Sequence, residues 1–76
     1  MTRIDSTIIT FGRNVQAARQ ALGISQEELA FRAGLHRTYI GMVERAERSI
    51  SLQNAKKIAD ALHINLDILL KNGEES

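Results

Sequence analysis

The chain has 76 residues, of which ten are Lys or Arg, nine are Asp or Glu and none is Cys. This length allows one domain with a single small core, so we expect no separate catalytic domain, and the lack of cysteine excludes disulfides and thiolate metal sites. No apolar run approaches the roughly 20 residues of a membrane span, and the first residues lack the apolar block of a signal peptide. We therefore expect a soluble, cytoplasmic protein that is stabilised by packing.

The first predicted helix lies in the N-terminal third of the chain. Residues 1–7 lack a helical spacing of apolar side chains, and we interpret them as an N-terminal arm. From about Ile8 or Thr10 onward, apolar residues recur every three to four positions, and Gly23 supplies a stop signal. These apolar residues are Phe11, Val15, Ala18 and Leu22. The pattern predicts one amphipathic helix that ends at Leu22.

Residues 25–48 contain two short helical patterns separated by a tight break. The first begins with SQEE, the form of a capping box, in which the Ser25 hydroxyl accepts a backbone N–H and Glu28 reaches back to the cap. Gly34 can adopt the left-handed conformation that ends a helix, so this helix has only two turns. A second helix follows, with His36 as its expected N-cap. Two short helices joined in this way form a helix-turn-helix.

The second of these helices has an unusual outer side. At 100° per residue its inner side contains Ile40, Val43 and Glu44. The outer side contains Thr38, Gly41, Met42 and Arg45, with Arg37 and Tyr39 on the flanks. This side lacks a carboxylate and suits the major groove of DNA, because Arg can contact guanine, Thr can contact a thymine methyl and Gly lets the backbone approach closely. The methionine could equally contact thymine or a partner surface.

Charge is distributed unevenly, although the net charge of the chain is only +1. Residues 32–57 contain six basic and two acidic side chains, a net charge of +4, and the remainder carries −3. Such asymmetry is typical of a module with one nucleic-acid-binding face, and chance patchiness of the surface is the competing explanation. In the arm, Arg3 could reach a backbone phosphate.

Two more helices are predicted after a polar connection at residues 46–50. Ser51 is the expected cap of the first, which has a broad apolar stripe. The stripe consists of Leu52, Ala55, Ile58, Ala59 and Leu62. The second follows a break at His63 and Ile64, with Asn65 as its expected cap. Its apolar residues, expected to fill the core, are Leu66, Leu69 and Leu70.

The whole pattern predicts an all-α fold of five helices, because the sequence has no strand pattern, proline or repeat. We expect an N-terminal arm at 1–7, a helix-turn-helix domain at 8–71 and a short tail at 72–76.

Residues from about Phe11 to Leu70 closely resemble the Cro/repressor-type helix-turn-helix family of phage and bacterial transcription regulators. Three motifs coincide: SQEELA, I-x-x-V-E, and ADAL followed by a short leucine-rich helix. The segments AGLHRTYI, VER and RSIS most resemble the controller proteins of restriction–modification systems, which are small dimers that regulate their own gene and the endonuclease gene. The resemblance implies a lambda-repressor-like bundle with the helix-turn-helix as its second and third helices, in a nucleoid-associated regulator of bacterial or phage origin.

The resemblance also implies roles for individual residues. The DNA bases would be contacted by Arg37, Thr38, Gly41 and Met42. The DNA backbone would be contacted by Gln26, Tyr39, Arg45 and Arg48. A structural ion pair would join Arg19 in the first helix to Glu44 in the third. The family usually has Gly or Asn where this chain has Ala46, so a left-handed alanine or a different turn is expected there.

We expect a homodimer on a palindromic operator, because a module of this size reads only a few base pairs. Two-fold symmetry would set the recognition helices about 34 Å apart. The joining surface must be apolar and remote from Arg37. It is predicted to consist of the apolar residues that five short helices cannot bury: Ile50, Leu52, Ile64 and Ile68.

Other function classes are less well supported by the sequence. No enzyme is expected, because no pocket-sized core or paired titratable groups are indicated. No metal is expected, since His36 and His63 lack Cys, Asp or Glu at ligand spacing. No cofactor, small-molecule ligand or membrane partner is expected either. The alternative is an antitoxin-type helix-turn-helix protein that binds a toxin and its own promoter, which a longer tail would favour. Whether binding represses, activates or does both stays open.

Overall fold

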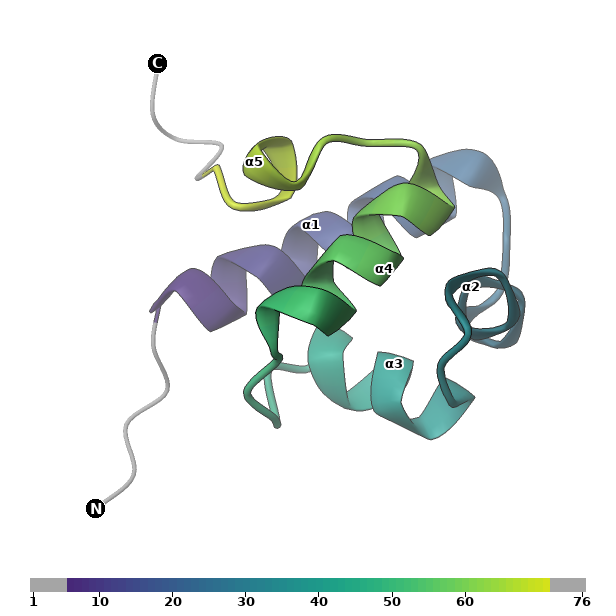
Figure 1. Cartoon of the computed structure of the whole chain (residues 1–76), viewed down its shortest axis with the longest axis horizontal. Helices are drawn as coiled ribbons and strands as arrows, with labels where there is room; N and C mark the ends of the chain where they lie inside the picture. The colour runs from purple at the N-terminus through teal and green to yellow at the C-terminus, as the bar shows by residue number, and fades with distance from the viewer. Residues whose placement is uncertain (1–5, 72–76) are drawn as a thin grey trace.

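The computed structural model describes residues 6–71, which form five helices in succession (Figure 1). They are α1 (Ser6–Leu22), α2 (Gln26–Ala33), α3 (Arg37–Glu44), α4 (Leu52–Leu62) and α5 (Leu66–Leu69). This range contains no strand, so the predicted all-α fold with a helix-turn-helix at α2 and α3 is confirmed. No helix within it has the length and apolar character needed to span a membrane. Arg3, the rest of 1–5 and the tail at 72–76 lie outside the described residues.

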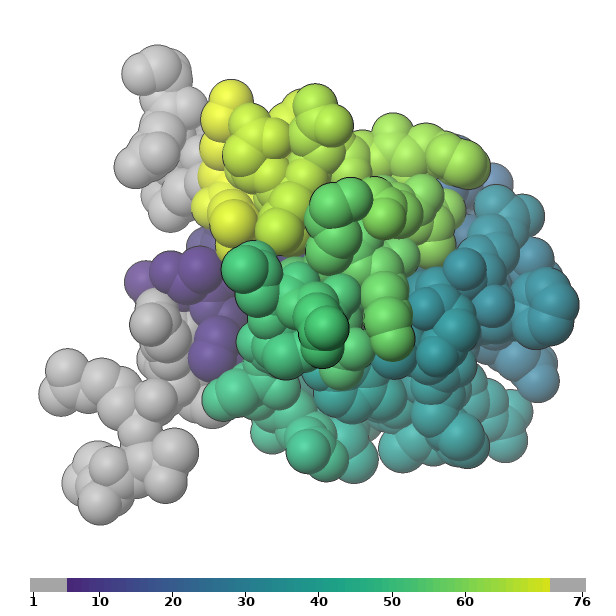
Figure 2. All heavy atoms as spheres, viewed as in Figure 1, coloured from purple at the N-terminus to yellow at the C-terminus, as the bar shows by residue number. Residues whose placement is uncertain are grey.

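The core lies where α1 packs against α3, α4 and α5, and where α2 packs against α3 and α4. Its fully buried large side chains are Phe11, Val15, Leu29, Ile40, Ile58, Leu62 and Leu69. Burial of each such side chain contributes about 1.5–3 kcal/mol before conformational entropy is counted. In the view of Figures 1 and 2, α4 crosses the middle of the molecule, with α3 below it and α5 above. Helices α3 and α5 therefore lie at opposite edges of this face.

Gly12 allows α1 and α3 to approach closely. A Cβ atom at this position would clash with the Val43 carbonyl oxygen and lie 3.0 Å from that of Glu44. Both oxygens belong to the backbone and cannot rotate away, so α1 can pack here only without a side chain. The apolar spacing of α1 gave no indication of this requirement.

Most helix ends follow the local sequence signals. The Ser25 hydroxyl accepts from the Glu28 N–H at 3.0 Å, and the Ser51 hydroxyl accepts from the Asn54 N–H at the same distance. His36 caps α3 through Nδ1, which accepts from the Thr38 N–H at 3.2 Å. Gly34 ends α2 in the left-handed region at φ 72°. Three of the four predicted N-caps and this stop are confirmed.

Two predictions about helix starts are wrong, and a third is confirmed in position only. Helix α1 begins at Ser6 rather than Ile8 or Thr10. The apolar spacing could not show this earlier start, because the side chains of the first turn are mostly exposed. Glu28 does not reach back to Ser25, because its Oε2 accepts from Arg32 Nε at 2.8 Å, a charged partner one turn away. Asn65 occupies the cap position of α5 but makes no side-chain capping hydrogen bond.

Two leucines predicted to be buried are largely exposed. Leu22 is 46% exposed and Leu70 is 42% exposed. Leu22 is the last residue of α1, beside the turn at Gly23, and Leu70 follows a helix of only four residues, in which Leu69 takes the buried position. A one-turn helix has room for few inward side chains.

Ala46 is left-handed, as anticipated, with φ 59°. The Ala46 N–H donates to the Val43 carbonyl at 3.1 Å, and the Glu47 N–H donates to the Met42 carbonyl at 2.8 Å. These two bonds form a Schellman motif at the end of α3. A non-glycine residue in this region is strained by about 1 kcal/mol, and the two bonds hold it there.

Candidate nucleic-acid interface

The beginning of α3 offers exposed polar side chains. Arg37 and Thr38 are exposed, and Tyr39 and Met42 are partly exposed. Arg37 belongs to none of the ion pairs found within residues 6–71. Its guanidinium therefore keeps all its donors for an external acceptor, as a bidentate base contact requires.

Gly41 does not have the exposure that its angular position predicted. It is buried, and a Cβ atom here would lie 3.1 Å from Arg45 Nη1 and 3.5 Å from Gln26 Oε1. The side chains of Gln26 and Arg45 thus lie across α3 at this point. The expected contact of DNA with Gly41 stays a prediction, and it would require the side chains of Gln26 and Arg45 to move aside.

Glu44 is the centre of a buried network that joins three helices. Its Oε2 accepts from Arg19 Nε at 2.6 Å, and its Oε1 accepts from Arg19 Nη2 at 3.1 Å and from Gln26 Nε2 at 2.9 Å. Arg19 Nη1 also donates to the Ile24 carbonyl at 2.9 Å. The side chains of Glu44 and Arg19 are 1% and 12% exposed. The ion pair implied by the resemblance is present, and Gln26 is its third member.

The pKa of Arg19 is raised, mainly because its guanidinium donates hydrogen bonds to Glu44 and also because of the opposite charge, while burial acts in the other direction. The network fixes the position of α3 relative to α1 and α2. It also orients Gln26, the first residue of α2, whose amide keeps a second N–H. A phosphate at this helix end would meet that N–H together with unpaired backbone donors.

Tyr39 is fixed by α4. Asn54 Nδ2 donates to Tyr39 Oη at 3.2 Å, so the phenol O–H keeps its proton for another acceptor. The Arg48 guanidinium carbon lies 6.0 Å from the centre of the Tyr39 ring. Two residues predicted to contact the DNA backbone are therefore close together, and Asn54 positions one of them. No local signal could have identified Asn54, because its role depends on how α3 meets α4.

Arg45 forms an ion pair with the carboxylate of Glu47. Its Nε and Nη2 donate to Glu47 Oε2 and Oε1 at 2.9 and 3.1 Å, and both side chains are more than half exposed. These hydrogen bonds are the main reason that the pKa of Arg45 is raised and that of Glu47 is lowered. Arg45 was predicted to contact the DNA backbone, but its pairing with Glu47 was not foreseen.

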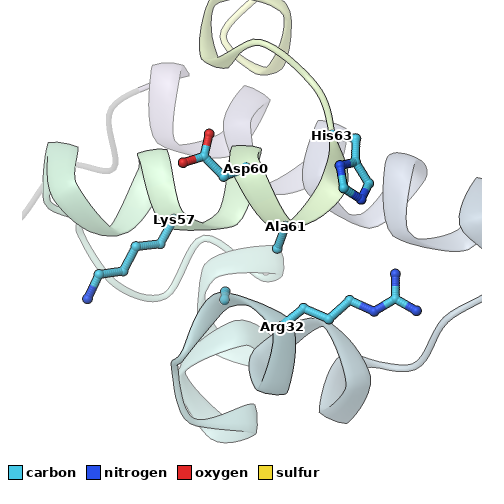
Figure 3. Close-up of a pocket in the computed structure, with 6 residues that line it drawn as sticks. Arg32, Lys57, Asp60, Ala61 and His63 are labelled. Atoms are coloured by element: carbon cyan, nitrogen blue, oxygen red, sulfur yellow. The ribbon is translucent and has the colours of Figure 1, made fainter.

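A depression of about 490 Å³ lies between α2 and α4 (Figure 3). Arg32 reaches it from α2, and Lys57 and Asp60 come from α4. Its charges are mostly paired elsewhere, because Arg32 binds Glu28 and Asp60 binds Lys56. No group of acidic, His or Cys residues in the described range could hold a metal ion. We assign no ligand to this depression.

An apolar groove of about 280 Å³ lies between the start of α1, the start of α4 and α5. Its apolar lining is Ile8, Phe11, Ile50, Leu52, Ala55, Leu66 and Leu70. Of the four residues predicted at a dimer interface, Ile50 and Leu52 line this groove. Ile68 is half exposed outside its lining, and Ile64 packs against the core. Leu70, which was not predicted at the interface, also lines the groove and is 42% exposed. Ile64 and Ile50 are both partly buried against the core, and their place at an interface stays a prediction.

The chain is similar to known helix-turn-helix proteins in sequence and in structure. A family model described as Helix-turn-helix matches residues 15–69. The control protein C.BamHI of Bacillus amyloliquefaciens is 44% identical over 63 residues, which cover 82% of this chain and 78% of that protein. The structure of the restriction-modification controller protein C.AhdI from Aeromonas hydrophila has a TM-score of 0.81 at 45% identity, covering 86% of this chain and 98% of that one. The P22 c2 repressor protein, in complex with a synthetic operator, has a TM-score of 0.75 at 31% identity, covering 80% and 92%.

Proposed function

This chain belongs to the helix-turn-helix family of DNA-binding transcription regulators, and we propose that it is a restriction–modification controller protein that binds a palindromic operator as a homodimer. It would act in the cytoplasm, at the nucleoid. The observation that carries the proposal is the exposed, cationic start of α3, held in place from behind by the buried Glu44 network. A rigid helix with unpaired donors on its outer side suits recognition of base edges in the major groove.

Sequence recognition is assigned to Arg37, with Thr38 beside it. Loss of one bidentate contact to guanine typically reduces discrimination by about 1–3 kcal/mol. We therefore expect Arg37→Ala to relax base preference at one position of each half-site. Arg48→Ala should weaken binding to all sequences similarly, because a phosphate contact reads no sequence.

These variants can be tested by selecting duplexes from a random pool and measuring affinity by fluorescence anisotropy at several salt concentrations. Lys57→Ala is the matched control, because Lys57 is also in no ion pair among residues 6–71 but lies on α4. The Lys57→Ala variant loses one positive charge, as Arg37→Ala does, but at a position outside α3. If Arg37→Ala bound the selected duplex as tightly as the unmodified protein, the assignment of α3 as the recognition helix would be wrong.

The homodimer is assigned to the apolar groove and its rim. Leu52, on the rim, is 75% exposed, and Leu70 and Ile68 leave further apolar surface open at α5. This surface includes residues from three helices, and α5 lies across the molecule from α3 (Figure 1). A second copy docked there would leave both recognition helices free for DNA.

Leu52→Asp is the sharpest test of this interface. Leu52 is the first residue of α4, where a carboxylate is favourable for the helix, so the variant should fold. Phe31→Asp is the matched control, because Phe31 is 81% exposed but lies on α2 outside the groove. Sedimentation should show a monomer for Leu52→Asp and a dimer for the control. A monomeric unmodified protein at tens of micromolar, or a selected site without two-fold symmetry, would contradict the model.

The antitoxin alternative has no specific observation in its favour. The relatives reported above are described as control, controller or repressor proteins. Purification of the chain with its natural promoter DNA and no second protein would be sufficient to test the distinction.

A further inference from the structure

Glu47 is paired with Arg45 beside the outer side of α3. Arg45 Nη1 lies 3.1 Å from the position that a Cβ of Gly41 would take, so the guanidinium folds back over α3. Its Nε and Nη2 meanwhile donate to both carboxylate oxygens of Glu47. Glu47 is thereby held next to the surface that the proposed function turns toward DNA.

We propose that Glu47 is an internal competitor for Arg45, which a DNA phosphate must displace when the protein binds. This inference rests on the proposed function, because it requires α3 to face DNA. A carboxylate and a phosphate use the same fork of guanidinium donors, and the fork of Arg45 is filled by Glu47. An incoming phosphate must therefore break the pair, and it then lies close to the released carboxylate.

The exposure of the pair makes this exchange possible. The side chains of Arg45 and Glu47 are 57% and 52% exposed, and an exposed ion pair is held only weakly. The raised pKa of Arg45 and the lowered pKa of Glu47 are consistent with a formed pair in free protein. By contrast, the Arg19–Glu44 pair is almost fully buried and is not available to DNA.

The expected consequence is that Glu47 weakens the binding of the protein to every DNA sequence. Glu47→Gln keeps the size of the side chain and removes its charge. For each protomer, we expect it to bind DNA roughly two- to fivefold more tightly, with a log–log salt dependence steeper by about one, because one more cation is free to release counterions. The gain should be equal for a duplex selected by the unmodified protein and for an unrelated duplex of the same length.

Asp60→Asn is the matched control. Asp60 is also exposed and pairs with a cation, Lys56, at 2.8 Å, but it lies on α4. The Asp60→Asn variant tests whether a change in net charge alone explains the tighter binding of Glu47→Gln. The double variant Arg45→Ala/Glu47→Gln, compared with Arg45→Ala, tests whether the gain acts through Arg45.

Affinity should be measured by fluorescence anisotropy over a series of salt concentrations, after circular dichroism has shown equal thermal stability. The inference is supported if Glu47→Gln tightens binding to both duplexes and the gain disappears without Arg45. It is overturned if Asp60→Asn gives an equal gain, if the gain persists without Arg45, if it appears on the selected duplex alone, or if Glu47→Gln weakens binding. Failure of the proposed function is separate, because it would appear as sequence-independent binding by the unmodified protein.

Discussion

Replacement of Glu44 by Ala is expected to destabilise the domain severely. The carboxylate is 1% exposed and accepts three hydrogen bonds from Arg19 and Gln26. Its removal leaves a guanidinium only 12% exposed, with one remaining bond to the Ile24 carbonyl. Removal of one partner of a buried pair typically costs about 3–5 kcal/mol, and the partial exposure of Arg19 places the expected loss near the lower limit.

The magnitude is large for a chain of 76 residues. Typical stability of about 0.05–0.15 kcal/mol per residue corresponds to a total of roughly 4–11 kcal/mol. A loss of about 3 kcal/mol would lower the melting temperature by roughly 12–24 °C. Urea denaturation followed by circular dichroism would measure the change in the free energy of unfolding. Glu47→Ala is the control, and because that pair is exposed we expect a loss of about 0–1 kcal/mol.

A double variant tests the physical cause. In Arg19→Met/Glu44→Met both charges are replaced by apolar side chains of similar length, so no unpaired charge stays buried. Such replacements are often neutral or stabilising, and we expect most of the lost stability to return. Equal effects of Glu44→Ala and Glu47→Ala would refute the reasoning. So would a double variant as unstable as Glu44→Ala, because the unpaired charge could then not be the cause.

Three other substitutions have expected outcomes. Gly12→Ala should lower the free energy of unfolding by about 1–3 kcal/mol in urea, because its Cβ would clash with backbone of α3. Ala46→Gly should raise it by about 1 kcal/mol in the same assay, because the residue has φ 59°. Asn14→Ala should accelerate hydrogen exchange in α5 and weaken self-association in sedimentation, because Asn14 Nδ2 donates to the carbonyls of Leu69 at 2.8 Å and Lys71 at 2.9 Å. Unchanged exchange would show that this contact does not hold α5 in place.

The helix-turn-helix could be predicted from sequence because its signals are local. A hydroxyl or imidazole cap bonds to an N–H two or three residues away, as at Ser25, His36 and Ser51. The glycine that ends α2 acts through its own backbone. Such interactions depend on neighbouring residues, so the order of side chains is sufficient to predict them.

The rest of the site depends on contacts between distant segments. Gln26 and Glu44 are 18 residues apart, and Asn54 and Tyr39 are 15 apart. Neither polar pair has a sequence pattern of its own, because the partners meet only after the helices have packed. The same holds for Gly12, whose role is set by a carbonyl of α3. The surface of α5 was predicted less well for a related reason, since a four-residue helix gives too little periodicity to separate Leu69 from Leu70.

The charge of the recognition side also differs from what a count along the sequence suggests. Within residues 32–57 three of the six basic side chains are held by carboxylates: Arg32 by Glu28, Arg45 by Glu47 and Lys56 by Asp60. Arg37 at the start of α3, Arg48 after it and Lys57 on α4 are in no ion pair within residues 6–71. Because a paired cation attracts phosphates less strongly, the attraction of this stretch for unrelated DNA is weaker than its six basic residues suggest. For the proposed operator-binding dimer, this distribution makes base contacts more important than the basic stretch alone implies.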